Sequence, residues 1–152
     1  MKFAIIATLV AAVSAQTKLT HSAAKAKTDA AGISIVSSGG CSDRNTATCT
    51  SLEQVNSNTV AGVVTLKGAC NCAITITGGT ETGHASGTYS HWNGYKLDLS
   101  KTTGLNSYVK NTFTQIADRG DGYPQWKAAS GNIYCDEGNH WDITFYTNGN
   151  LS

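Results

Sequence analysis

The stretch Ser90-His91-Trp92-Asn93-Gly94-Tyr95-Lys96-Leu97-Asp98-Leu99 decides the fold that we expect for this chain. Near its end, Leu97 and Leu99 alternate with Lys96 and Asp98, and this period of two is typical of a strand that buries one face. The Asp98 carboxylate should therefore lie on the face opposite the two leucines. The Asn-Gly pair just before the strand favours a turn.

Further strands and helices are expected on both sides of this strand. Ala73–Thr77 alternates with period two and stops at a glycine pair, which predicts a second half-buried strand. Thr50–Glu53 fits a helix-capping box, and apolar residues follow at helical spacing toward Leu66. We therefore expect a helix that begins near Leu52.

The C-terminal third continues this mixed pattern. Apolar residues at three- and four-residue steps predict one helix face that ends near Arg119: Leu105, Tyr108, Val109, Phe113 and Ile116. A turn is expected at Asp121–Pro124, followed by strands at Ile133–Cys135 and Trp141–Thr147. Together these elements predict an α+β domain with a small antiparallel sheet flanked by helices.

Length and charge limit the classes of function. The chain has 152 residues, 40% of them hydrophobic, which suits one domain with a single modest core. Its formal net charge is +1, and Lys and Arg are scattered without a basic run. We therefore expect a monomer with no nucleic-acid partner.

The N-terminus has the pattern of an export signal. Lys2 precedes the apolar run Phe3–Val13, and small residues up to Ala15 suit a signal peptidase, so residues 1–15 are predicted to be a cleaved signal peptide. The run is too short for a permanent anchor, which needs about 20 residues. We therefore expect a secreted, extracellular protein without stable membrane insertion.

Residues 16–40 are interpreted as a linker or pro-segment. They are rich in Ala, Lys, Thr and Ser and lack a sustained apolar face. His21 falls in this segment and is expected to be inert. The folded functional domain is then expected to span residues 41–152.

The five cysteines should be oxidised where geometry allows, since an exported chain meets an oxidising environment: Cys41, Cys49, Cys70, Cys72 and Cys135. A bridge between Cys41 and Cys49 would close a short loop at the start of the domain. Cys135 could then pair with Cys70 or Cys72, which leaves one thiol unassigned. A cysteine zinc site is a weaker alternative, because Cys70 and Cys72 are closer in sequence than zinc-binding cysteines usually are.

Two motifs far apart in the chain carry the expected chemistry. The first holds His91 and Asp98, and the second is Glu137-Gly138-Asn139-His140. Two neutral imidazoles and one carboxylate can fill three positions of a zinc tetrahedron and leave the fourth to water. Zinc brings the pKa of bound water toward about 7, so that Glu137 need only accept and relay a proton. The motifs therefore predict a hydrolytic metal site.

These motifs also resemble those of a known peptidase family. Ser90-His91-x-x-Gly94-x-x-x-Asp98, followed by Glu137-x-x-His140-Trp141-Asp142, is similar to the D-Ala-D-Ala metallopeptidases, whose superfamily includes lysostaphin-type endopeptidases and the hedgehog signalling domain. The resemblance covers residues 73–145. It implies a hedgehog/DD-peptidase-like fold, and it implies peptidoglycan stem peptides or cross-bridges as substrate. Carried over, the zinc ligands are His91, Asp98 and His140, and the catalytic base is Glu137.

One departure from the family concerns specificity. The family usually has Ser-Gly-Tyr-Arg after the preceding strand, where this chain has Thr77-Gly78-Gly79-Thr80-Glu81. The missing Arg would bind a terminal carboxylate. We therefore expect cleavage of internal amide bonds, unless Arg119 or Lys101 replaces the missing residue.

Several neighbouring residues are candidates for supporting roles. Asp142 lies two residues after His140 in a predicted strand and can orient an imidazole, although such an aspartate is more often structural. His84 can contact substrate or act as a hydrogen-bonded loop residue. Tyr89 and Trp141 are expected in the walls of a cleft or in the core.

Two other classes of function remain open. A metal-free secreted ribonuclease could use His91, Glu137 and His140 for acid–base cleavage with Arg119, although the low basic charge disfavours RNA. A noncatalytic cell-wall-binding module could retain zinc without hydrolysis. Metal content separates the ribonuclease from the other two, and hydrolysis of peptidoglycan separates the peptidase from the module.

Overall fold

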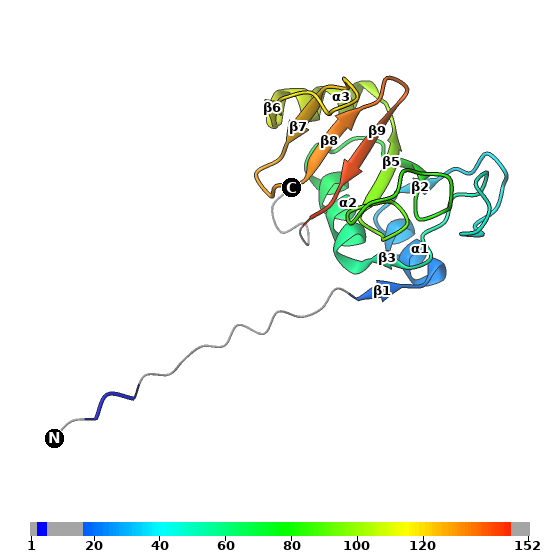
Figure 1. Cartoon of the computed structure of the whole chain (residues 1–152), viewed down its shortest axis with the longest axis horizontal. Coiled ribbons are helices and arrows are strands. Elements are labelled where there is room, and N and C mark those ends of the chain that lie inside the picture. The colour runs from blue at the N-terminus through cyan, green and yellow to red at the C-terminus, as the bar shows by residue number, and fades with distance from the viewer. Residues whose placement is uncertain (1–2, 6–16, 147–152) are drawn as a thin grey trace.

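The computed structural model describes residues 3–5 and 17–146, which form a mixed α+β fold as predicted (Figure 1). Its helices are α1 (His21–Ala30), α2 (Ser57–Cys70) and α3 (Thr103–Thr112). Its strands are β1 (Lys18–Leu19), β2 (Ser34–Ile35), β3 (Val55–Asn56), β4 (Thr75–Gly78), β5 (Lys96–Ser100), β6 (Thr114–Ile116), β7 (Gln125–Lys127), β8 (Ile133–Asp136) and β9 (His140–Thr144). Apart from residues 3–5, the expected signal peptide lies outside the described residues. None of the described helices has the length and apolar character needed to cross a membrane.

Seven strands form one sheet in the order β2-β4-β5-β9-β8-β7-β6, and β1 pairs separately with β3. Within the larger sheet β2 and β4 are parallel, and all other neighbours are antiparallel. A mostly antiparallel sheet is what the sequence predicts. The sheet is larger than expected because it also contains β2, β6 and β7. These strands are two or three residues long, too short for a period of two to be recognised in the sequence.

One face of the sheet packs against the helices and forms the core. Leu97 pairs with Ile143 and Leu99 with Trp141 across β5 and β9, and all four side chains are fully buried. Figure 1 shows α2 behind these central strands, where it adds apolar side chains to the same core: Val60, Val63 and Leu66. Each fully buried aliphatic side chain contributes about 1.5–3 kcal/mol to folding.

Residues 18–35 of the segment interpreted as a linker or pro-segment carry β1, α1 and β2, so the linker interpretation is wrong there, while removal as a pro-segment stays a prediction. The hydroxyl of Thr20 caps α1 by accepting the N–H of Ala23. Helix α1 buries Ala24 and Thr28, and β2 joins the sheet beside β4. These small buried residues allow close packing without the large apolar stripe that identifies an amphipathic helix in a sequence.

His21 is a structural residue, contrary to the expectation that it is inert. Its Nδ1 accepts the backbone N–H of Leu52 at 2.9 Å, and its own backbone N–H donates to Oε2 of Glu53 at 2.7 Å. Since Glu53 binds α1, the capping box predicted at Thr50–Glu53 does not form. Helix α2 begins later, after Gln54 has taken a left-handed backbone conformation with φ of 65° that no helix can include.

Helix α3 also ends earlier than predicted. Leu105 and Val109 lie on its buried face, as expected. Phe113 is extended, with ψ of 163°, and Ile116 belongs to β6 instead of the helix. The helical spacing of Phe113 and Ile116 therefore does not correspond to one helix.

The cysteines pair partly as predicted. Cys41 and Cys49 form the expected disulfide, but the second bridge joins Cys70 to Cys72, so the predicted pairing of Cys135 with one of them is wrong. Asn71, with φ of 47°, reverses the chain at the end of α2 and brings the two neighbouring sulfurs together. Cys135 is a buried free thiol on β8, and burial raises its pKa to about 11.

Candidate metal centre

Asp98 and Asp142 lie directly opposite each other on β5 and β9. Because Leu97 and Leu99 point into the core, Asp98 points to the other face of the sheet, as predicted. The side chains of Asp98 and Asp142 are only 12% and 6% exposed. Like charges at directly paired positions destabilise a sheet. This pair therefore needs positive charge close by.

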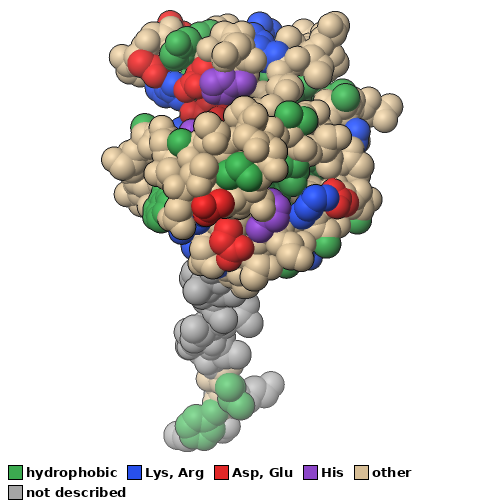
Figure 2. All heavy atoms as spheres, turned by 90° about the vertical axis from the view of Figure 1, so that its right-hand side faces the viewer, with side chains coloured by type: hydrophobic (Ala, Val, Ile, Leu, Met, Phe, Trp, Pro, Cys, Tyr) green, Lys and Arg blue, Asp and Glu red, His purple; other side chains and the backbone are tan. Residues whose placement is uncertain are grey.

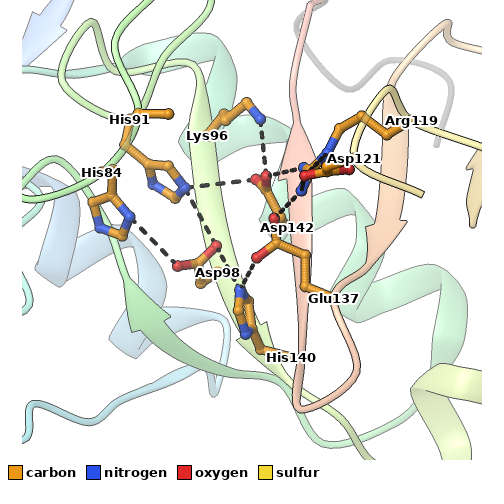
Figure 3. A pocket seen from close by; sticks show the side chains of 10 residues that line it. His84, His91, Lys96, Asp98, Arg119, Asp121, Glu137, His140 and Asp142 are labelled. Carbon is orange, nitrogen blue, oxygen red and sulfur yellow. Dashed lines mark hydrogen bonds and ion pairs between the residues drawn. The ribbon is translucent and has the colours of Figure 1, made fainter. Parts of the chain in front are cut away.

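His91 reaches the two carboxylates from the loop before β5 (Figure 3). Its Nδ1 lies 2.8 Å from the carbonyl oxygen of Gly79, and its Nε2 lies 3.3 Å from Oδ1 of Asp98 and 3.5 Å from Oδ1 of Asp142. A carbonyl oxygen can only accept, so Nδ1 carries a proton. A hydrogen bond of this kind typically orients a histidine that binds metal through its other nitrogen.

The charges of this cluster shift the pKa of both buried partners. Burial lowers the pKa of His91, but Asp142 and Asp98 outweigh burial and raise it to about 9. Burial raises the pKa of Asp142, whereas His91 and Lys96 lower it, and the result lies well below the usual range. In the metal-free protein a protonated His91 therefore neutralises part of the paired carboxylate charge.

The donor set fits a metal ion. Oδ1 of Asp98 and Oδ1 of Asp142 are buried, and neither has a hydrogen-bond partner among the described residues. Both oxygens face Nε2 of His91, at 3.3 and 3.5 Å, but a buried carboxylate oxygen without a hydrogen bond is costly, and a cation bound between these oxygens would reduce that cost. Nitrogen and oxygen donors of this kind suit zinc and other divalent transition metals.

His140 and Glu137 stand beside this group, across the tight turn between β8 and β9. Nε2 of His140 lies 3.6 Å from Oδ1 of Asp98 and 2.6 Å from Oε2 of Glu137. The other ring nitrogen, Nδ1, bonds Oδ1 of Asn139 at 2.5 Å. Gly138, with φ of 90°, allows the turn that brings Glu137 and His140 together. The structure thus gathers all four residues that the two motifs predict.

Arg119 and Lys96 form the basic side of the site. Nη1 of Arg119 donates to Oδ2 of Asp142 at 2.8 Å, and Nζ of Lys96 donates to the same oxygen at 2.9 Å. Arg119 also donates to Glu137 and, through Nε, to Oδ1 of Asp121 at 2.9 Å. Asp142 is therefore a shared acceptor of the basic side chains, and its other oxygen faces Nε2 of His91, whereas the contact that orients this ring comes from Gly79.

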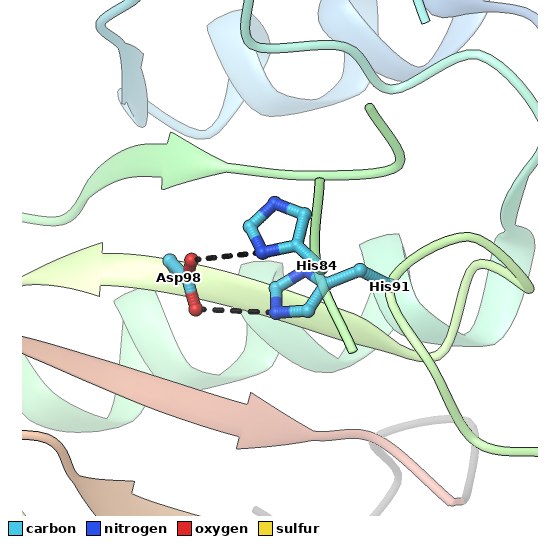
Figure 4. Close-up of side chains that lie close together, drawn as sticks. All are labelled: His84, His91 and Asp98. Carbon is cyan, nitrogen blue, oxygen red and sulfur yellow. Dashed lines mark ion pairs between the residues drawn. The ribbon is translucent and has the colours of Figure 1, made fainter. Parts of the chain in front are cut away.

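His84 lies closer to the centre than the sequence indicated. Its Nδ1 is 3.9 Å from Oδ2 of Asp98, and its ring stacks on His91 with centroids 3.8 Å apart. Ligand atoms of His84, His91 and Asp98 all lie within 4.8 Å of one another, so these three residues could hold a metal ion (Figure 4). Glu81, which the sequence did not single out for the site, bonds Nε2 of His84 at 2.6 Å. The only sequence signal for this part of the site was the presence of a further histidine, His84, in the loop before His91.

An open cleft of about 470 Å³ gives access to these residues. Its lining includes the three histidines, both paired aspartates and the Arg119–Glu137 pair. Figure 2 shows histidine, acidic and basic side chains gathered near the top of one face of the molecule. The cleft is therefore polar and charged, as a site for metal-dependent chemistry on a polar substrate should be.

Three further candidates lie away from the cleft. Trp141 is fully buried, and its Nε1 donates to Oδ1 of Asn106, which places it in the core. Tyr89 is 48% exposed and packs edge-on against Tyr95 and Tyr146, outside the cleft lining. Nζ of Lys101 is 2.7 Å from Asp136 and does not line the cleft, so Arg119 is the better placed of the two proposed replacements for the missing Arg.

Comparisons with known proteins add no assignment, since no family model, curated protein or solved structure matches the chain. The resemblance to D-Ala-D-Ala metallopeptidases consequently remains an interpretation of the two motifs and of the geometry that they adopt.

Proposed function

We propose that this chain is a secreted zinc-dependent peptidase that hydrolyses amide bonds of peptidoglycan stem peptides or cross-bridges. One observation carries the proposal: Nε2 of His91 and Nε2 of His140 lie 3.3 and 3.6 Å from the same buried Asp98 oxygen, which has no hydrogen-bond partner among the described residues. His91, Asp98 and His140 would hold the ion. When bound, zinc polarises a scissile carbonyl and acidifies a water molecule.

The protein groups around this centre suit amide hydrolysis. Glu137 would take the proton of the attacking water, and its contact with Arg119 holds the carboxylate in place. Nε2 of His140 lies 2.6 Å from Glu137 in the metal-free site, so the proposed base stands beside a proposed ligand. Lys96 and Arg119 line the same cleft and provide positive charge where the tetrahedral intermediate becomes negative.

The test combines metal analysis with digestion of purified peptidoglycan, followed by mass spectrometry of the released fragments. We expect about one zinc per chain and new amino groups at cleaved stem or bridge peptides. Cleavage of RNA by metal-free protein would instead support a ribonuclease. Zinc binding with retention on peptidoglycan but without cleavage would identify a binding module. Either result would overturn the peptidase.

A further inference from the structure

Glu81 is a buried carboxylate in the loop before β5, where it accepts hydrogen bonds from the backbone and contacts His84. It is 2% exposed, and its oxygens accept the backbone N–H groups of Ser51 at 3.0 Å and of Gly79 at 2.8 and 2.9 Å. Its Oε2 also lies 2.6 Å from Nε2 of His84. Two backbone N–H groups and one ring nitrogen thus converge on this single carboxylate.

This contact decides which nitrogen of His84 is free. An ionised carboxylate can only accept, so Nε2 of His84 carries the proton and Nδ1 presents a lone pair in the neutral ring. A carboxylate that holds the far nitrogen of an imidazole is the usual outer partner of a metal-bound histidine. His91 is held in the same way by Gly79, with its nitrogens in the opposite order.

The free nitrogens of both rings face Asp98. Nδ1 of His84 lies 3.9 Å from Oδ2, and Nε2 of His91 lies 3.3 Å from Oδ1, so each oxygen faces one ring (Figure 4). The ligand atoms of His84 and His91 lie within 4.8 Å of each other. For comparison, two nitrogen ligands of one tetrahedral zinc ion lie about 3.4 Å apart, given bonds of about 2.05 Å. The ring planes are 15° apart, so the two lone pairs run nearly side by side, and binding of one shared ion requires one ring to tilt toward the other.

We propose that His84 is a protein ligand of this metal ion through Nδ1 and that Glu81 positions it. This inference rests on the proposed metal centre and adds to His91, Asp98 and His140 a fourth protein ligand that neither motif contains, so the water would take a fifth position on the ion. It also assigns a role to Glu81, which occupies the stretch where the resembling family has its Arg. The loop 81–91 thereby contributes two imidazoles to the ion, and Glu81 supports one of them.

The test records the imidazole nitrogen spectrum of the full-length, 15N-labelled protein before and after one equivalent of zinc. We expect Nδ1 of His84 and Nε2 of His91 to shift to metal-bound values while the protons at their partner nitrogens remain. His21, which contacts Leu52, should not change and serves as the internal reference. Cobalt substitution gives a second readout, because its visible absorption reports the number and type of ligands.

Variants test the same point by chelator competition for zinc. His84→Ala should weaken zinc binding by at least about tenfold and change the cobalt spectrum, and Glu81→Gln should weaken binding by about 10–100-fold. Thr82→Ala alters an exposed side chain in the same loop and should leave both readouts unchanged. If the Glu81 variant fails to fold, the histidine spectrum of the wild type decides by itself.

The outcomes separate this inference from the proposed function. Metal-bound shifts for His91 without any for His84, together with unchanged affinity in His84→Ala, would overturn the inference alone. Metal-bound shifts for both histidines in a protein that cleaves no peptidoglycan would support the inference and overturn the peptidase. A wild-type chain that takes up no zinc would overturn both.

Discussion

Oε2 of Glu137 lies 2.6 Å from Nε2 of His140, so the proposed base and a proposed zinc ligand share a contact in the metal-free site. Metal binding at His140 would compete with this contact and release Glu137 toward the water that the metal binds. The two residues come from a single tight turn, which explains why a short motif can supply both roles. Their different functions can be separated by substitution.

Glu137→Gln should keep zinc and lose most turnover, because an amide cannot accept the water's proton. A loss of about 10²–10⁴ in kcat is expected for a removed general base. Asp121→Asn is the matched control, since Asp121 also accepts from Arg119 but has no contact with His140. His140→Ala should lose zinc and activity together. Near-normal turnover in Glu137→Gln would assign the base to another residue.

The metal-free protein should lose stability at alkaline pH. The pKa of His91 is raised from 6.5 to about 9 in the folded state, so its stabilising charge is fully present below about pH 6.5 and is lost as the pH rises through 9. A shift of this size corresponds to roughly 3 kcal/mol. Urea unfolding in chelator across this range measures the loss, and His91→Gln should flatten the profile. A stability that rises from pH 6.5 to 9 would contradict the assignment.

Gly78→Ala should damage the metal centre from the neighbouring strand. Gly78 pairs with Asp98, and an added Cβ would lie 2.4 Å from Oδ2 of Asp98. Because Cβ and Cγ of Asp98 would also lie 3.0 Å from the added atom, Asp98 should shift and zinc affinity should fall by tenfold or more, with a stability cost of about 1–3 kcal/mol. Gly68→Ala, where no atom lies within 4 Å of the added Cβ, is the control. Equal zinc affinity in both variants would show that Asp98 tolerates the contact.

Helix α1 should be required for stability. Ala24 is fully buried, whereas Ala26 in the same helix is exposed. Ala24→Asp places a charge in the core and should lower the free energy of unfolding by about 2–5 kcal/mol, while Ala26→Asp should change it by less than about 0.5 kcal/mol. Chemical unfolding measures both. If both substitutions changed the free energy of unfolding by a similar small amount, residues 16–40 would be better described as a linker.

Cleavage should favour internal amide bonds. Arg119 already bonds Asp121, Glu137 and Asp142, which leaves little of its guanidinium for a substrate carboxylate. Cross-linked muropeptides should therefore be cut faster than a free pentapeptide that ends in D-Ala-D-Ala, as chromatography of timed digests would show. Faster release of the terminal D-Ala would identify Arg119 as the anchor, and Arg119→Lys should then slow that release because bidentate binding is lost.

Local sequence patterns were sufficient for the centre of the fold and for the motif residues. The alternation around Leu97 predicts β5 and the direction of Asp98, because side-chain direction in a strand follows from a period of two. The Glu137–His140 spacing across a glycine turn predicts that both residues lie together. The Cys41–Cys49 bridge follows from a short loop that two cysteines can close. Each of these depends on residues that are close in sequence.

Burial, backbone conformation and strand register decided the rest. Whether Glu53 caps α2 or binds α1 depends on His21, thirty-two residues away, and the pairing of Cys70 with Cys72 depends on the backbone at Asn71. His84 acquires its place beside Asp98 only because buried Glu81 holds its ring, and Asp142 becomes a shared acceptor only because β9 pairs with β5. These contacts depend on burial, on backbone conformation and on strand register. None of the three can be read from the local spacing of side chains in the sequence.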